Sequence, residues 1–313
     1  MNCLISGIAG DIGLGVARIL QSKNFGWKIH GMDIQSDHPG SFFCDYVTTS
    51  PRADDRNYIN WLFKYIQKNN IDFFIPTSEA EILRLYQDKI ELLAGAVIVI
   101  TNNLAIEKGL DKHECLNYLS TCGVPVPEHG LLNKNTPISY PCIIKPRAGQ
   151  GSKGLRKVYS AEQLPTDSSQ SLVWQEYLDP DDEEYTCPIF RSNTTGTRSL
   201  VIRRTLQGGY TSKGEVINNY EINDYLNLIA KSLDLNGVMN VQLRLTNQGP
   251  RLFEINPRLS STLVFRDKMG FCDLDWLISL KLGLPISGYI PPSAGTRFYR
   301  GNQEYIINGV RDE

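Results

Sequence analysis

The segment from Val238 to Arg258 places the strongest restriction on how this chain can fold. Two apolar runs flank an Asn-Gln-Gly-Pro turn, a pattern that predicts a β-hairpin. If the strands pair symmetrically about Gln248, then Gln242 lies opposite Glu254, and Asn256 shares their face because strand side chains alternate. One carboxylate and two amide oxygens suit a hard cation such as Mg²⁺ that is shared with phosphates. A polar face turned to solvent would also explain this pattern.

Composition limits the classes of protein to which the chain can belong. Its 313 residues are 41% hydrophobic and 21% charged, as expected for a soluble globular protein of two or three domains. The net charge of −2 argues against nucleic-acid binding. Seven dispersed cysteines without a Cys-x-x-Cys pair indicate reduced thiols. No signal peptide is recognisable, and the longest apolar run, 92–100, is too short to span a membrane, so we expect a cytoplasmic location.

The first hundred residues alternate between apolar strand segments and amphipathic helix segments. This order predicts a parallel, doubly wound α/β sheet of the Rossmann-like kind. Gly7, Gly10 and Gly13 follow the first strand, and Asp33 ends the second, which is similar to a dinucleotide fingerprint. An NAD-dependent oxidoreductase is therefore one interpretation, although no Tyr-x-x-x-Lys pair is present. Close packing of the helix on the strand is the alternative explanation for the glycines.

Glu79 and Glu81 follow the strand that ends at Pro76. In open α/β sheets, ligand sites lie at the carboxyl ends of strands, which would favour a functional role for these acids. Ser78 and Glu81 also have the spacing of a helix capping box, which explains them nearly as well.

Lys145 is the next unusual residue, because it ends the apolar strand 140–146. A lysine in such a strand needs an anionic partner. The loop that follows contains Gly149, Gly151, Ser152 and Gly154, and glycine-rich backbone can present N–H groups to phosphates. It joins a strand to a strand and lacks Gly-Lys-Ser/Thr, so it is not a Walker loop; a plain flexible hairpin is the other interpretation.

Two further segments carry candidate ligand contacts. The strand 171–178 ends in Glu176, Tyr177 and Leu178, where backbone groups could pair with a flat base and the acidic loop beyond could bind ribose hydroxyls. Arg203 and Arg204 end a later strand, and only one of them should reach a site because neighbouring strand residues face opposite sides.

In order and spacing, these motifs resemble those of ATP-grasp ligases, of the branch similar to the carbamoyl-phosphate synthase large chain. The resemblance covers about residues 1 to 290. It implies a Rossmann-like domain (1–103) followed by a two-lobed ATP-grasp fold of mixed α/β and α+β type. The small lobe with its glycine-rich lid would span 104–178, and the large lobe with the metal site and C-terminal tail 179–313.

The resemblance also implies a role for each motif residue. Lys112 and Lys145 would bind ATP phosphates, with 149–154 closing over them. Residues 176–178 would lie beside adenine and Glu184 would bind ribose. Gln242, Glu254 and Asn256 would hold Mg²⁺ or Mn²⁺, and Arg258 would steady the transferred phosphoryl group with help from Arg203 or Arg204.

The implied reaction joins a small-molecule carboxylate to an amine or similar nucleophile through an acyl phosphate. Ser260-Ser261 stands where many relatives have glycines, which leaves the acceptor unidentified. An ATP-binding regulatory protein without turnover is a further interpretation. We expect no nucleic-acid or membrane partner and leave a homodimer open.

Overall fold

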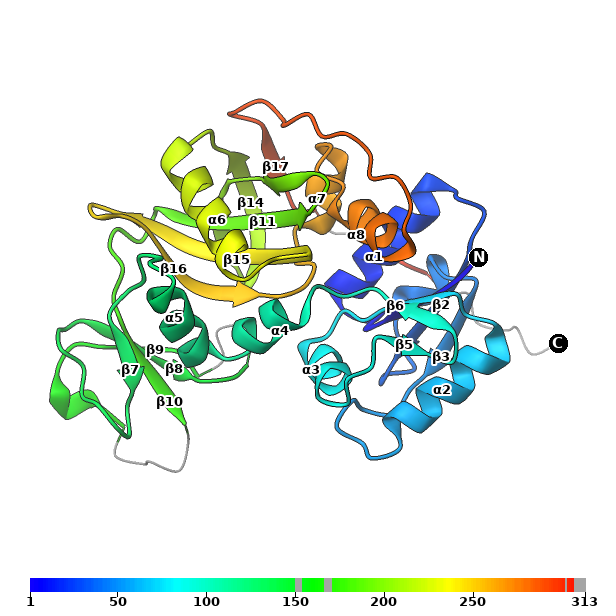
Figure 1. Ribbon diagram of the computed structural model, residues 1–313, viewed down its shortest axis with the longest axis horizontal. Helices are drawn as coiled ribbons and strands as arrows, with labels where there is room; N and C mark the ends of the chain where they lie inside the picture. Colours follow the sequence, from blue (N-terminus) through cyan, green and yellow to red (C-terminus); the bar gives the residue numbers. More distant parts are fainter. Residues whose placement is uncertain (150–153, 166–170, 302, 307–313) are drawn as a thin grey trace.

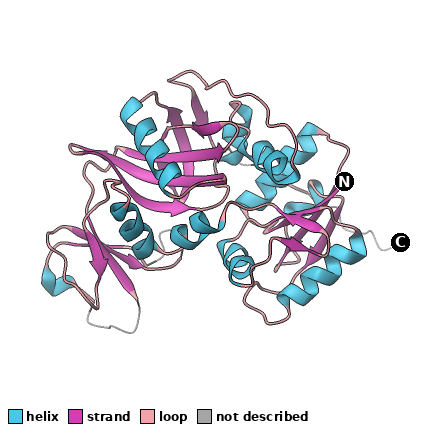
Figure 2. Ribbon diagram, in the orientation of Figure 1, coloured by secondary structure: helices cyan, strands magenta, loops and turns pink. Residues whose placement is uncertain are grey.

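The computed structural model describes residues 1–149, 154–165, 171–301 and 303–306. It contains three β-sheets that follow one another along the chain, each with helices packed against it (Figures 1 and 2). The mixed α/β fold that the sequence predicts is confirmed.

The first sheet has six strands in the order β3-β2-β1-β4-β6-β5, and only β5 runs antiparallel to its neighbour. Successive residues of β1 face opposite layers. Leu4 packs in the core formed with α2 and α3, whereas Cys3 and Ile5 pack in the core formed with α1, α7 and α8. The elements are β1 (Asn2–Ser6), α1 (Asp11–Lys23), β2 (Lys28–Asp33), the 3₁₀ helix η1 (Pro39–Phe42), β3 (Tyr46–Thr49), α2 (Tyr58–Asn69), β4 (Phe73–Ile75), α3 (Glu79–Gln87), β5 (Leu92–Leu93) and β6 (Ala96–Ile98).

Two short helices, α4 (Asn103–Gly109) and α5 (Lys112–Thr121), follow the first sheet. The break between them has a local cause. The Asp111 side chain accepts hydrogen bonds from the main-chain N–H groups of His113 and Glu114, so it caps a new helix. This cap places Lys112 in the first turn of α5.

The second sheet is small and antiparallel, in the order β7-β10-β8-β9. Its core contains Cys142, Ile144, Val158 and Trp174. The glycine-rich segment joins β8 to β9, as predicted for a strand-to-strand loop. The elements are β7 (His129–Leu131), β8 (Cys142–Pro146), β9 (Arg156–Val158), the 3₁₀ helix η2 (Ala161–Gln163) and β10 (Leu172–Glu176).

The third sheet has seven strands, in the order β16-β15-β11-β13-β14-β17, with β12 also paired to β11. Helix α6 packs on it, and α7 and α8 pack between it and the first sheet (Figure 1). The elements are β11 (Glu184–Ser192), β12 (Gly196–Ser199), β13 (Ile202–Gln207), β14 (Tyr210–Val216), α6 (Tyr220–Ser232), β15 (Gly237–Thr246), β16 (Gly249–Asn256), α7 (Leu263–Lys268), α8 (Asp273–Leu282) and β17 (Arg297–Tyr299).

The domain boundaries at 103 and 178 stay predictions. Within the described ranges, every helix is too short or too polar to cross a lipid bilayer.

Candidate active site

The predicted hairpin is formed by β15 and β16, and a one-residue bulge sets the positions of its polar side chains. The register of the two strands shifts between Gln242 and Leu243, where Phe253 is the extra residue. Beyond the shift, Gln242 lies opposite Glu254, as predicted. The symmetry about Gln248 does not continue to the turn, because the pairing there is offset by one residue.

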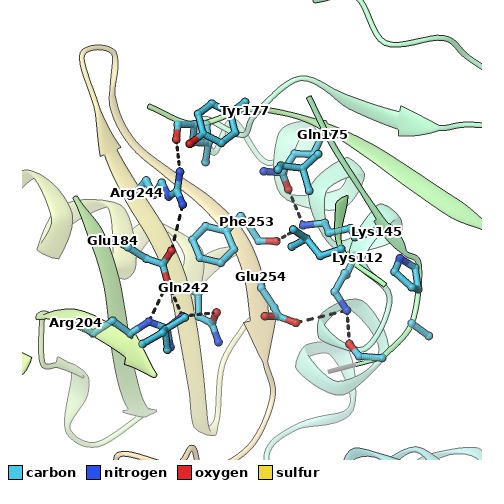
Figure 3. A pocket seen from close by; sticks show the side chains of 17 residues that line it. Lys112, Lys145, Gln175, Tyr177, Glu184, Arg204, Gln242, Arg244, Phe253 and Glu254 are labelled. Atoms are coloured by element: carbon cyan, nitrogen blue, oxygen red, sulfur yellow. Dashed lines mark hydrogen bonds and ion pairs between the residues drawn. The ribbon is translucent and has the colours of Figure 1, made fainter. Parts of the chain in front are cut away.

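A cavity of about 160 Å³, the first cavity, lies between this hairpin and the second sheet (Figure 3). Its apolar walls are formed by Ile143, Leu155, Leu178, Leu206 and Phe253. Its polar lining comes from Lys112, Lys145, Gln175, Glu184, Arg204, Gln242, Arg244 and Glu254. The cavity therefore combines a slot for a flat apolar group with cations suited to phosphate.

Lys145 enters the first cavity from β8 and is only 6% exposed. Its ammonium group donates hydrogen bonds of 2.7 Å to the side-chain oxygen of Gln175 and to the main-chain carbonyl of Phe253, the bulge residue. Both hydrogen-bond partners are neutral, and burial lowers the pKa of Lys145 to about 8. An anion in the cavity would stabilise the charged form of this lysine.

Lys112 bridges the glycine-rich segment and the hairpin. Its ammonium group donates to the main-chain carbonyl of Gly149 and lies 3.5 Å from Oε1 of Glu254. Gly149 and Gly154 have positive φ angles, +120° and +76°, which favour glycine. Gly151 and Ser152 lie outside the described residues, so their contact with phosphate stays a prediction.

The predicted hinge contributes Tyr177 and Leu178 to the first cavity. The side chain of Glu176 lies elsewhere, because it accepts a 3.1 Å hydrogen bond from the main-chain N–H of Glu128. The carbonyl of Leu178 accepts a hydrogen bond from the guanidinium group of Arg244. Arg244, which was not predicted from the sequence, also lines the first cavity (Figure 3).

Glu184 lines the first cavity, where the resemblance expects a ribose contact. Its Oε1 accepts hydrogen bonds of 2.8 and 3.1 Å from Arg204, and its Oε2 lies 3.4 Å from Arg244. A carboxylate has several lone pairs, so Glu184 can still accept a sugar hydroxyl while it orients both arginines.

The structure separates the two neighbouring arginines. Arg204 lines the cavity and its side chain is 9% exposed. The side chain of Arg203 is 43% exposed and lies 3.7 Å from both Glu183 and Glu215, outside the first cavity. Strand alternation explains the difference, as expected for a pair of which only one side chain reaches the site; the assisting role of that arginine, Arg204, stays a prediction.

Each of the three predicted metal ligands already contacts a cationic side chain. The amide oxygen of Gln242 accepts from Arg204 at 2.9 Å, and that of Asn256 accepts from Arg258 at 3.1 Å. Glu254 has Lys112 at 3.5 Å. Three oxygen donors that lie on one face and attract positive charge fit a hard cation such as Mg²⁺.

A second cavity, of about 580 Å³, lies between the third sheet and the carboxyl edge of the first sheet. Gln242, Glu254, Asn256 and Arg258 line it, together with residues that include Asp11, Asp33, Thr77, Asn240, Ser260 and Ser261. Arg258 is 9% exposed and donates a 2.6 Å hydrogen bond to Glu79 at the start of α3. This ion pair couples the first sheet to the end of the hairpin.

The two acids near α3 have different roles. Glu81 is buried and accepts hydrogen bonds from the hydroxyl groups of Ser6, Tyr58 and Ser78, and the main-chain N–H of Glu81 donates to Ser78 as in a helix cap. Burial raises the pKa of Glu81. Glu81 therefore stabilises the start of α3, whereas Glu79 pairs with Arg258, which lines the second cavity.

The N-terminal glycine turn supports the packing interpretation. A Cβ on Gly13 would approach the carbonyl oxygen of Gly7 to 2.3 Å, so glycine allows α1 to lie close to the turn. The carboxylate of Asp33 accepts hydrogen bonds from the main-chain N–H groups of Ala9 and Gln35. In a dinucleotide site this acid would bind ribose instead, which disfavours the NAD interpretation.

Some residues of the site were missed for identifiable reasons. Arg244 lies two residues beyond Gln242 on the same strand, so its face was predictable from alternation. Gln175 interrupts an apolar strand, a signal like that of Lys145. Glu79 was a candidate from its place at a strand end, but its partner Arg258 lies 179 positions away and no local pattern indicates that contact.

Comparison with known proteins gives matches along most of the chain. Residues 12–100 match the "PylC-like, N-terminal domain" family, and residues 168–297 match the family "ATP-grasp in the biosynthetic pathway with Ter operon". The carbamoyl phosphate synthase large chain of Sulfurisphaera tokodaii is 26% identical over 232 residues, or 66% of this chain. The chain spans only 22% of that relative's length.

Solved structures share the architecture. The N5-carboxyaminoimidazole synthetase of Staphylococcus aureus complexed with ADP superposes with a TM-score of 0.74 at 19% identity, covering 91% of this chain and 78% of that one. The biotin carboxylase–β,γ-ATP complex of Campylobacter jejuni has a TM-score of 0.70 at 15% identity, covering 92% and 72%. The predicted two-lobed fold behind a Rossmann-like domain is thereby confirmed.

Proposed function

We propose that the chain is an ATP-grasp ligase that depends on ATP and Mg²⁺. It would activate a carboxylate as an acyl phosphate for attack by an amine or a similar nucleophile. One observation carries this proposal: Arg204, Leu206, Gln242 and Glu254 line both cavities. A nucleotide in the first cavity would therefore present its terminal phosphate to a substrate in the second.

The lining of the first cavity offers a contact for each part of a nucleotide: base, sugar and phosphates. The base would lie between the apolar walls near Leu178, with Glu184 at the sugar. Lys112 and Lys145 would neutralise the phosphates. Gln242, Glu254 and Asn256 would hold Mg²⁺, or Mn²⁺ in its place, and the bound ion would supply charge neutralisation at the phosphates.

In the second cavity, the reaction needs positioning and positive charge but no nucleophilic side chain. A carboxylate oxygen of the substrate would attack the γ-phosphorus while the bond to the departing ADP oxygen breaks. Arg204 and Arg258 would stabilise the charge on the transferred group. The nucleophile would then attack the acyl carbon, and inorganic phosphate would leave.

The similar structures support use of ATP, since one is an ADP complex and another a β,γ-ATP complex. The acceptor is not assigned by them.

All seven cysteines are free thiols, which fits a reducing compartment and supports the proposed cytoplasmic location. Assembly as a homodimer stays a prediction.

The test is an ADP-release screen across a panel of carboxylates with hydroxylamine present. We expect one class of acid to release ADP and to yield a hydroxamate in equal amount, because hydroxylamine traps an acyl phosphate. Arg258→Gln should lose both products, whereas Arg203→Gln should retain them. Nucleotide binding without acid-dependent ADP release would refute the ligase and favour a regulatory protein. Fluorescence transfer to added NADH would favour the oxidoreductase.

A further inference from the structure

The turn that follows Arg258 contains two serines with different surroundings. Both Ser260 and Ser261 line the second cavity. The hydroxyl group of Ser260 donates a 3.1 Å hydrogen bond to the side-chain oxygen of Asn240 and accepts one of 2.8 Å from Arg266. The hydroxyl group of Ser261 forms no hydrogen bond with any residue that the structure describes. Of the two serines, Ser261 is therefore the one whose hydroxyl group is available to a substrate.

A buried ion pair holds the Ser260 side of this turn. Arg266 on α7 is 1% exposed and donates two hydrogen bonds of 2.9 Å to the carboxylate of Asp273. The same guanidinium group donates to the carbonyl of Ser260 at 3.3 Å and to the hydroxyl of Thr262 at 3.0 Å. Apolar side chains often replace a buried ion pair without loss of stability, so stability alone does not account for this pair. Its hydrogen bonds to the turn fix the main chain directly after Arg258.

A second arginine holds the Ser261 side of the turn. Arg300 follows β17, and its guanidinium group donates to the carbonyl of Ser261 at 2.8 Å and to that of Thr211, on β14, at 3.0 Å. The main-chain N–H of Arg300 also donates to the carbonyl of Ser212 at 2.7 Å. Tyr210, the neighbour of Thr211, lines the second cavity, as Ser261 does. Arg300 thus ties two walls of this cavity together.

We propose that the hydroxyl group of Ser261 donates a hydrogen bond to the carboxylate substrate beside Arg258. Arg266 and Arg300 are positioning residues, because they hold the main chain of the turn from either side. This inference rests on the proposed function and adds to it a residue that binds the acid. Neither serine of the turn lines the first cavity. Loss of the Ser261 hydroxyl group should therefore weaken binding of the acid and leave nucleotide binding unchanged.

The test measures ADP release by the full chain as the concentration of the acid is varied. The probe is the acid that yields the most hydroxamate with the wild type in the hydroxylamine screen, and ADP affinity is measured by calorimetry with Mg²⁺ present. For Ser261→Ala we expect the KM for the acid to rise about 10- to 100-fold, as for loss of a hydrogen bond to a charged group, at unchanged ADP affinity. An unchanged KM for the acid would overturn the proposal, as would an equal loss of ADP affinity.

A variant of Arg300 tests the positioning role. Arg300 is exposed, so Arg300→Met creates no cavity in the core, and the KM for the acid should again rise. Because Arg300 acts through Ser261, the double variant with Ser261→Ala should be no worse than Ser261→Ala alone; additive effects would overturn the positioning role. Arg297→Met is the matched control and should keep the wild-type KM, because Arg297 is 63% exposed and pairs with Glu215.

Failure of the inference can be told from failure of the proposed function. If the wild type forms a hydroxamate and Ser261→Ala keeps the same KM for the acid, the ligase stands and only the role of Ser261 falls. If the wild type binds ADP but forms no hydroxamate with any acid of the panel, the ligase proposal falls, and the inference falls with it.

Discussion

ATP binding should weaken as the pH rises above 8, and Lys145 is the physical reason. Burial among neutral hydrogen-bond partners lowers the pKa of this lysine to about 8 in the free protein. Phosphate binding favours the charged ammonium form, whereas rising pH favours the neutral amine. The direction of the effect is therefore fixed: affinity is higher at pH 7 than at pH 9 and falls as the pH passes through the pKa that Lys145 has in the free protein.

The size of the effect follows from this pKa. With a pKa of about 8, about nine-tenths of Lys145 is charged at pH 7 and about one-tenth at pH 9. If binding requires the ammonium form, the dissociation constant for ATP rises about tenfold between these pH values. Because ATP restores the charge, binding near pH 8 should also take up a fraction of a proton, which calorimetry in buffers of different ionisation enthalpy can detect.

Two variants make this prediction specific. Lys145→Met should bind ATP about 10- to 100-fold more weakly at pH 7, as expected for loss of a charged hydrogen bond, and should lose the dependence on pH. Lys213→Met, at an exposed position on β14, should keep the wild-type dependence of ATP binding on pH. A wild-type dissociation constant that stays constant from pH 7 to 9 would refute the reasoning, as would an unchanged pH dependence in Lys145→Met.

Three further substitutions test other parts of the site. Glu254→Ala should abolish ATP turnover; normal ADP release would remove this residue from the metal site. Glu79→Gln should lower kcat more than it raises the KM for ATP, because it removes the carboxylate that pairs with Arg258 and leaves the lining of the first cavity unchanged; a pure KM effect would contradict this role. Gly13→Ala should lower the free energy of unfolding in urea by about 1–3 kcal/mol, because its Cβ would meet a carbonyl oxygen at 2.3 Å. Gly288→Ala, which has open space around its Cβ, should be near neutral, and equal effects at both glycines would contradict the packing account.

Much of the candidate site could be predicted from short stretches of sequence. The polar positions 242, 254 and 256 share a face because strand side chains alternate, and a lysine that ends an apolar strand requires partners for its charged group. The alternation of strands and helices in the first hundred residues likewise predicts the parallel sheet. These inferences succeed because each depends on spacing within one element.

Other features were decided by contacts between distant parts of the chain. The bulge at Phe253 offers its carbonyl to Lys145, 108 positions away, and Glu79 meets Arg258 across 179 positions. Local spacing also could not predict whether Arg203 or Arg204 is buried, since that depends on which elements cover each face of β13. The sequence by itself predicted that lysines and a glycine-rich loop face a set of oxygen-bearing side chains. Only the tertiary structure paired each of those oxygen-bearing side chains with a cationic side chain, because long-range packing sets which charges come within hydrogen-bonding distance.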